Sequence, residues 1–64
     1  MCLSTVYKNE MKPENIAMAN VMEIECKGDM VILTDLLERQ VAIRGVLVSA
    51  NLVEGRALVR EISE

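Results

Sequence analysis

The residue pattern of this chain predicts an all-β domain. Val, Ile and Leu are dense from Val21 to Ile62, and only brief turn signals interrupt them, which is typical of strands. Gly28-Asp29 lies at the centre of one such stretch, and Gly45 lies within another. Glycine in a two-residue connection predicts a β-hairpin, and glycine inside a strand predicts a bulge or a bend.

The first strand is expected to span Cys2 to Tyr7. Alternation leaves neither of its faces plainly apolar, so we expect it at a sheet edge or across an interface. The polar stretch from Lys8 to Glu14 is expected to be a loop. A short helical turn after Pro13 fits there, because proline suits the first position of a helix.

The clearest local prediction is a hairpin from Val21 to Thr34. Gly28-Asp29 fits a type II′ turn, which would pair Lys27 with Met30 and so determine the register behind them. In that register one face is apolar and consists of Met22, Ile24, Cys26, Val31 and Leu33. The other face is mostly polar and consists of Glu23, Glu25, Lys27, Thr34, Met30 and Ile32.

The second half of the chain is expected to hold three more strands. Asp35–Arg39 is a connection or, alternatively, one helical turn, and Glu54-Gly55 is the final turn. The strands are expected at Gln40–Arg44, Val46–Val53 and Arg56–Ile62. Their inward residues would then be Val41, Ile43, Val48, Ala50, Leu52, Ala57 and Val59.

Five to six short antiparallel strands with a bend in the middle close most readily into a small SH3-like barrel. Closure removes the exposed edges that a short open sheet would leave. We therefore expect one domain over residues 1–64, with a core too small to give a large stability by itself.

Charge and hydropathy restrict the classes of partner. Seven basic and ten acidic residues give a net charge of −3, so the overall basic field that attracts nucleic acid is missing. The sequence contains no apolar run long enough to span a membrane and no signal-peptide pattern, so we expect a cytoplasmic protein. A disulfide between Cys2 and Cys26 is not expected in that reducing compartment.

Catalysis is not expected. The chain has no histidine, its serines have no evident base partner, and Glu23 and Glu25 are interpreted as solvated carboxylates on an outer face. A zinc-finger site is also excluded, because there is neither a Cys-x-x-Cys pair nor a histidine. The five methionines have no convergent spacing, and Cys26 is expected to be buried as a small hydrophobe.

Cys2 differs from these residues because it directly follows the initiator methionine. If Met1 is removed, the chain begins with a thiolate, an α-amine and nearby backbone amides such as that of Leu3. Sulfur combined with deprotonated nitrogen donors suits nickel(II) or copper(II) better than zinc. A single terminus offers few strong ligands, whereas two termini on a two-fold axis would form a shared site. The competing interpretation is that Cys2 has no role beyond its place in a short strand.

Three segments resemble one known family. Met1-Cys2-Leu3-Ser4-Thr5-Val6-Tyr7 is similar to the Met-Cys-x-Ser-x-Val-Tyr start of CooT-type nickel-binding proteins, and the segment from Lys27 to Asp35 and Gly45 before the final hairpin are similar as well. The resemblance implies a homodimeric β-barrel that binds Ni(II) through Cys2 and the backbone nitrogen of Leu3. It also implies a role in delivering nickel to a client such as the carbon monoxide dehydrogenase machinery.

The same family has been labelled as RNA-binding, and this is the main competing hypothesis. Small barrels that bind unpaired bases use stacking aromatics and a basic track. Tyr7 is the only aromatic residue, and the basic residues are scattered, although Arg44, Arg56 and Arg60 could gather on the folded surface. Two further hypotheses are a protein adaptor and a purely structural module.

Overall fold

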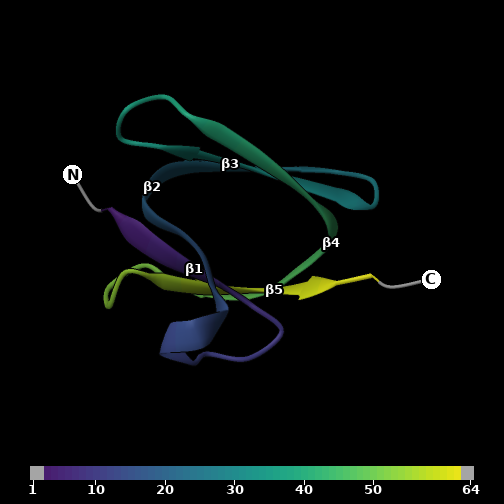
Figure 1. The fold of residues 1–64 in the computed structure, drawn as a ribbon, viewed down its shortest axis with the longest axis horizontal. Helices are drawn as coiled ribbons and strands as arrows, with labels where there is room; N and C mark the ends of the chain where they lie inside the picture. The colour runs from purple at the N-terminus through teal and green to yellow at the C-terminus, as the bar shows by residue number, and fades with distance from the viewer. Residues whose placement is uncertain (1–2, 63–64) are drawn as a thin grey trace.

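Five strands follow one another along the chain and pair in the same order. The computed structural model describes residues 3–62. The elements are β1 (Ser4–Lys8), the 3-10 helix η1 (Pro13–Asn15), β2 (Ile16–Lys27), β3 (Met30–Asp35), β4 (Gln40–Asn51) and β5 (Arg56–Glu61). The sheet closes into a barrel in the order β1-β2-β3-β4-β5 (Figure 1). The all-β prediction, the closed barrel and the turn after Pro13 are confirmed.

The barrel closes through one parallel pair of strands, although we expected only antiparallel pairing. Four neighbouring pairs are antiparallel, whereas β1 runs parallel to β5 from Thr5↔Arg56 onward. An up-and-down order with an odd number of strands makes this unavoidable, because the first and last strands then point the same way. β1 therefore lies between two neighbours and buries Val6, so its expected place at a sheet edge is wrong.

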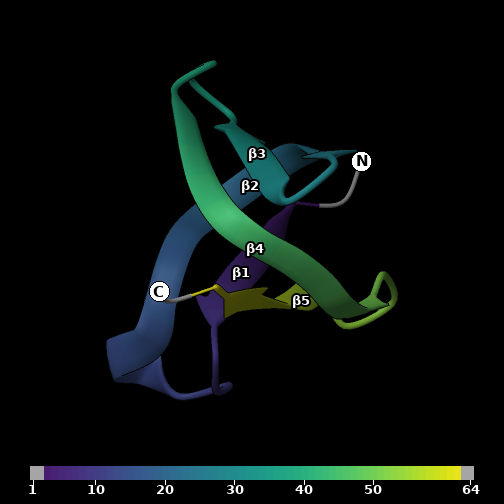
Figure 2. The same cartoon turned by 90° about the vertical axis from the view of Figure 1, so that its right-hand side faces the viewer.

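The two long strands bend and belong to two layers. β2 pairs with β1 through its first half and with β3 through its second half, while β4 pairs first with β3 and then with β5. Figure 2 shows β4 as one curved ribbon that connects the two layers. The separate strands expected before and after Gly45 are therefore one continuous strand, although the expected bend is present.

Gly45 lies where β4 turns from one layer to the other. A Cβ atom at this position would overlap the backbone carbonyl oxygen of Arg60 on β5. Only glycine lets the two backbones approach this closely, which explains why the bend in the strand coincides with a glycine.

The hairpin between β2 and β3 has the register that we expected. Lys27 pairs with Met30, and the pairing continues through Ile24↔Leu33. Gly28 has a φ of 58°, which agrees with glycine at the first position of a type II′ turn. β2 begins five residues before the expected Val21, since its first half pairs with β1.

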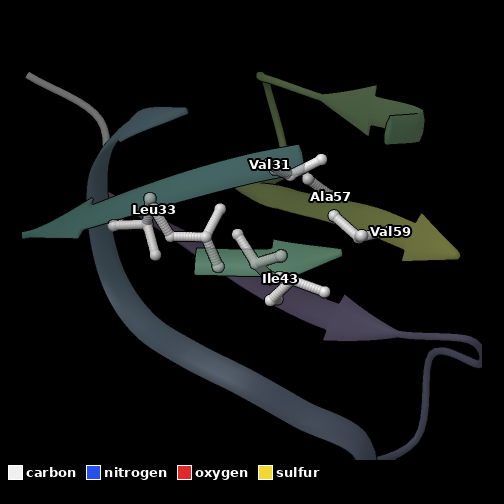
Figure 3. Close-up of a cluster of buried hydrophobic side chains, with 7 residues drawn as sticks. Val31, Leu33, Ile43, Ala57 and Val59 are labelled. Carbon is white, nitrogen blue, oxygen red and sulfur yellow. The ribbon is translucent and has the colours of Figure 1, made fainter. Parts of the chain in front are cut away.

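Seven side chains form the core, and they come from all five strands: Val6, Val21, Val31, Leu33, Ile43, Ala57 and Val59 (Figure 3). The inward positions predicted for β3 (Val31 and Leu33), for Ile43 and for β5 (Ala57 and Val59) are therefore confirmed, and the predicted Ile24 is half-buried against the core. Several residues expected in the core are exposed instead, namely Met22, Cys26, Val41, Val48, Ala50 and Leu52.

Three physical causes contribute to these errors. The last connection is the four-residue loop 52–55, closed by the pair Asn51↔Arg56, so Leu52 lies in a loop and not in a strand. A register shift after Leu47 further changes the alternation along β4. Cys26 lies near the hairpin tip, where β3 is the only described strand that pairs with β2, and its side chain is exposed.

Candidate functional site

The N-terminal end of β1 is held from two sides. Ser4 pairs with Val21 of β2, and the amide of Thr5 donates a hydrogen bond of 2.8 Å to the carbonyl oxygen of Gly55. Cys2, the predicted metal ligand, lies outside the described residues. Leu3, whose backbone nitrogen is the other predicted donor, is described and is half-buried. The chain is therefore anchored to the barrel within two residues of Cys2.

Gly55 brings the β4–β5 loop against this part of the chain. Its φ is 72°, and a Cβ atom there would lie 3.1 Å from the carbonyl oxygen of Leu3. A side chain at this position would therefore be strained by the backbone and crowded against Leu3. Glycine here lets the loop pack directly beside the residue that follows Cys2.

A hollow of about 370 Å³ opens next to the same strand end. Its walls are Ser4 of β1, four consecutive residues of β2 and one loop residue, and they consist of Ser4, Val21, Met22, Glu23, Ile24 and Leu52. The lining is mostly apolar, with one hydroxyl and one carboxylate. This hollow can accept an apolar side chain or a short peptide segment next to the N-terminal end of β1.

Two loops at this end expose large apolar side chains. Leu36 and Leu37 follow β3, and Leu52 and Val53 follow β4, with exposed fractions of 51%, 69%, 70% and 97%. We call these four residues the apolar rim. Figure 1 shows both loops and the start of β1 on the left side of the barrel. Exposed apolar side chains that lie together on a small protein are typical of an interaction surface.

The β3–β4 half of the rim is held in shape by a buried carboxylate. Oδ1 of Asp35 accepts hydrogen bonds of 2.9 Å from the amides of Leu37 and Arg39, and Oδ2 accepts one of 2.8 Å from Nε of Arg39. Asp35 itself is only 3% exposed. The connection is therefore an ordered turn, and the alternative of a helical turn between Asp35 and Arg39 is wrong.

These contacts also set the acidity of Asp35. Burial by itself raises the pKa of the carboxyl, but the hydrogen bonds from Arg39 and Leu37, together with the charge of Arg39, outweigh it. The pKa of Asp35 is therefore lowered below its ordinary value of 3.8. An ionised Asp35 keeps the loop closed at neutral pH. Its sequence signal was an aspartate at the end of a predicted hydrophobic strand. Aspartate side chains in turns commonly accept hydrogen bonds from backbone amides that follow them.

The basic residues do not form a free cationic surface. Six of the seven make ion pairs with carboxylates on the folded chain, and these are Lys8, Lys12, Lys27, Arg39, Arg44 and Arg56. These basic side chains are the groups that would contact the phosphates of a nucleic acid, and each of them is already next to a carboxylate.

The other predicted candidates do not add to the site. Cys26 is a free, exposed thiol near the hairpin tip. Residues 3–62 contain no group of three or more His, Cys, Asp or Glu side chains that could hold a metal ion. Over the same part of the chain, no helix is long and apolar enough to cross a membrane.

The fold and the site define a class: a small all-β barrel with an anchored first strand, an adjacent apolar hollow and an apolar rim. The family model described as "CO dehydrogenase accessory protein CooT" matches residues 1–60. The chain therefore belongs to the CooT family of CO dehydrogenase accessory proteins, and the resemblance seen in the sequence is confirmed. No curated protein matches the chain. The family is one of accessory proteins, which assigns this chain an accessory role.

Proposed function

We propose that this protein is a nickel-binding accessory protein of the CO dehydrogenase machinery. In this proposal the Cys2 thiolate and backbone nitrogens, including that of Leu3, bind Ni(II) as cargo where two copies meet. The protein would act without catalysis of its own, in the cytoplasm, where the thiol stays reduced. The observation that supports the proposal most is the family match, because it covers nearly the whole chain and includes Cys2.

The chemistry of the donors supports nickel. The chain has no histidine, and no acidic or thiol cluster occurs within residues 3–62, so oxygen-rich and tetrahedral sites have no evident ligands there. A thiolate with deprotonated nitrogens suits a planar d⁸ ion such as Ni(II). One chain supplies few such donors, and a second copy would double them.

The apolar rim supports the dimer. Leu52 and Val53 are largely exposed at the end of the barrel where the anchored Leu3 lies. Pairing two copies through this end would remove apolar surface from water and bring the two N-termini together. Metal binding would then stabilise the dimer, because each dimer binds the ion better than a separate chain does.

The test is a titration with Ni(II), followed by absorption and by sedimentation. We expect a thiolate-to-nickel charge-transfer band in the wild-type protein and a stoichiometry of one ion per two chains. Cys2→Ser should lose the band, while Cys26→Ser should keep it, because Cys26 lies near the hairpin tip and away from the start of β1. An unchanged spectrum in Cys2→Ser would contradict the proposal.

A second variant separates the metal site from the dimer. Leu52→Lys with Val53→Lys places charges on the rim without touching any proposed ligand. We expect the sedimentation coefficient to fall to that of a monomer and nickel affinity to fall with it. Full dimerisation in this variant would show that the rim is not the interface.

A further inference from the structure

The β4–β5 loop is ordered by contacts within itself. The side-chain oxygen of Asn51 accepts a hydrogen bond of 3.0 Å from the amide of Glu54, and its backbone carbonyl oxygen accepts one of 2.8 Å from the amide of Gly55. The Glu54 carboxylate also pairs with Arg56, the first residue of β5. All of these contacts lie within residues 51–56, so they hold the loop in shape without help from β1.

This loop contacts the beginning of β1 through Gly55. The carbonyl oxygen of Gly55 accepts a hydrogen bond of 2.8 Å from the amide of Thr5. A Cβ atom at position 55 would lie 3.1 Å from the carbonyl oxygen of Leu3 and 4.0 Å from Cα of Ser4. On the other side of β1, Ser4 pairs with Val21. The backbone of residues 3–5 is therefore held between β2 and the loop.

The left-handed φ of 72° does not by itself require a glycine at position 55. Asn9, Asn20 and Glu38 adopt φ values of 73°, 57° and 65° in the same chain. Asparagine reaches this region at modest cost, because its short polar side chain can hydrogen-bond locally. What position 55 does require is the missing side chain, since a Cβ atom there would press against Leu3.

The amide of Leu3 is directed toward the same loop. In an extended chain the N–H and C=O groups of alternate residues point the same way, and Thr5, two residues later, donates to Gly55. The Leu3 carbonyl oxygen lies near Gly55, which agrees with this direction. Among the backbone hydrogen bonds outside the strands of residues 3–62, none uses the Leu3 amide. No such bond has to break before the Leu3 nitrogen loses its proton to a metal ion.

We propose that Gly55 is a positioning residue of the nickel site: because it has no side chain, the β4–β5 loop can fix the backbone of Leu3 where its nitrogen binds the ion. This inference rests on the proposed nickel site and adds to it a residue from the other end of the sequence. A Cβ atom at position 55 would make Leu3 or the loop move by a few tenths of an ångström. A metal–donor distance tolerates about 0.2 Å of change, so a displacement of this size weakens the bond.

The test replaces each of two left-handed glycines with asparagine. Gly55→Asn and Gly28→Asn both introduce a residue that tolerates a positive φ, but only the first adds atoms beside Leu3, since nothing lies within 4 Å of a Cβ atom at Gly28. We expect Gly55→Asn to bind Ni(II) about tenfold more weakly and to shift the thiolate-to-nickel band, as is typical when a residue that orients a ligand is changed. Gly28→Asn should match the wild type in both measurements.

Amide NMR of the metal-free proteins gives a readout that needs no nickel. In Gly55→Asn the resonances of Leu3, Ser4 and Thr5 should shift, while those of the β2–β3 hairpin tip should stay in place. An unshifted Leu3 resonance would overturn the proposal, because the loop would then not fix this residue. Equal weakening of nickel binding in Gly55→Asn and Gly28→Asn would overturn it as well, since the cause would then be a general loss of stability.

Asn51→Ala changes the loop without adding any atom near Leu3, so it provides the test should Gly55→Asn fail to fold. It removes the side-chain acceptor for the amide of Glu54, and we expect nickel binding to weaken by about threefold as the loop loosens. Asn9→Ala is the matched control, because Asn9 follows the far end of β1 and accepts a hydrogen bond of 2.8 Å from the amide of Glu61. An equal loss of affinity in Asn9→Ala, or none in Asn51→Ala, would contradict positioning by the loop.

The nickel site and the role of Gly55 fail in different ways. Absence of nickel binding in the wild-type protein would overturn the nickel site, and the positioning role of Gly55 with it. Nickel binding by the wild type, together with an unchanged affinity and band in Gly55→Asn, would overturn the positioning role alone.

Discussion

The two ends of the barrel differ in what they expose. At the hairpin tip, charged side chains pair with one another, as Lys27 does with Glu25 and Arg44 with Asp29. At the end where β1 begins, the rim exposes leucine and valine next to an apolar hollow (Figure 1). Surface ion pairs are already well solvated, whereas apolar side chains gain free energy when a partner covers them. A partner that covered the end where β1 begins would therefore gain more free energy from burial than one that covered the hairpin tip.

The small size of the core explains why so much apolar surface is left for such contacts. Seven apolar residues are buried in the core, while twelve large apolar side chains are exposed over the described residues. A barrel of this size has a large surface for its volume and cannot enclose all of them. Several lie in the loops and bends that a barrel places at its ends, as Leu37 and Val53 do.

The largest predicted effect concerns the corner that joins the two layers. Gly45→Val would push side-chain atoms into the backbone of Arg60, so we expect a loss of about 3 kcal/mol or more, or failure to fold. Gly28→Ala is the matched control at the hairpin tip, where nothing lies within 4 Å of a new Cβ. It should lose only about 1 kcal/mol, from its positive φ. Urea unfolding measures both, and similar losses would contradict the close approach at Gly45.

Two aspartates test the comparison between the ends directly. Asp35→Asn replaces a buried carboxylate oxygen that accepts from Arg39 with an NH₂ group, which leaves two donors facing each other. Asp29→Asn removes only an exposed partner of Arg44 and should cost at most about 1 kcal/mol. We expect the Asp35 variant to lose several times more stability in urea. Equal losses would show that the turn after β3 does not depend on its carboxylate.

Acid should weaken the rim end before the hairpin tip. The pKa of Asp35 is lowered in the folded protein, so its contribution to stability is present above the ordinary value of 3.8 and is lost as pH falls through the folded pKa. We expect a decrease in the urea midpoint between about pH 5 and pH 3 that is smaller in Asp35→Asn than in the wild type. Asp29→Asn controls for general acid effects, and it should retain most of the wild-type decrease.

The smallest effect on the stability of one chain is expected at the rim itself. Leu52→Ser with Val53→Ser removes exposed apolar groups, so unfolding of the monomer should change by no more than about 0.5 kcal/mol. Association of copies should nevertheless weaken in sedimentation experiments if the rim is an interface. Val46→Ser, a change at another exposed apolar residue, is the control. If only Val46→Ser weakened the dimer, the interface would lie on β4 and not at the rim.

Local features were predictable because neighbouring residues alone determine them. Gly28 selects the hairpin turn, and the turn in turn determines the pairing of β2 with β3. The last turn was less predictable, because Asn51 shapes it. The side-chain oxygen of Asn51 accepts a hydrogen bond from the amide of Glu54, and its backbone carbonyl accepts one from the amide of Gly55. The loop is therefore two residues longer than expected. Leu52 thereby moves from the expected core to the rim.

The candidate site was predictable only in part. The proposal that Cys2 and Leu3 bind a metal came from the start of the sequence and its resemblance to a family, and the family is now confirmed over residues 1–60. The hollow, the buried Asp35 and the apolar rim were not foreseen. They arise where segments distant in sequence come into contact. The alternation of apolar and polar residues along one strand does not indicate which other segments that strand will contact.

By itself the sequence determined the all-β class, the β2–β3 hairpin, the bend at Gly45 and the inward residues of β3. Only the tertiary structure decided that β1 lies between β2 and β5 and that Leu3 lies beside Gly55. The physical reason is the range of the interactions. Turn chemistry and alternation act over a few residues, whereas barrel closure brings together residues about fifty positions apart, and their contact depends on the packing of all five strands.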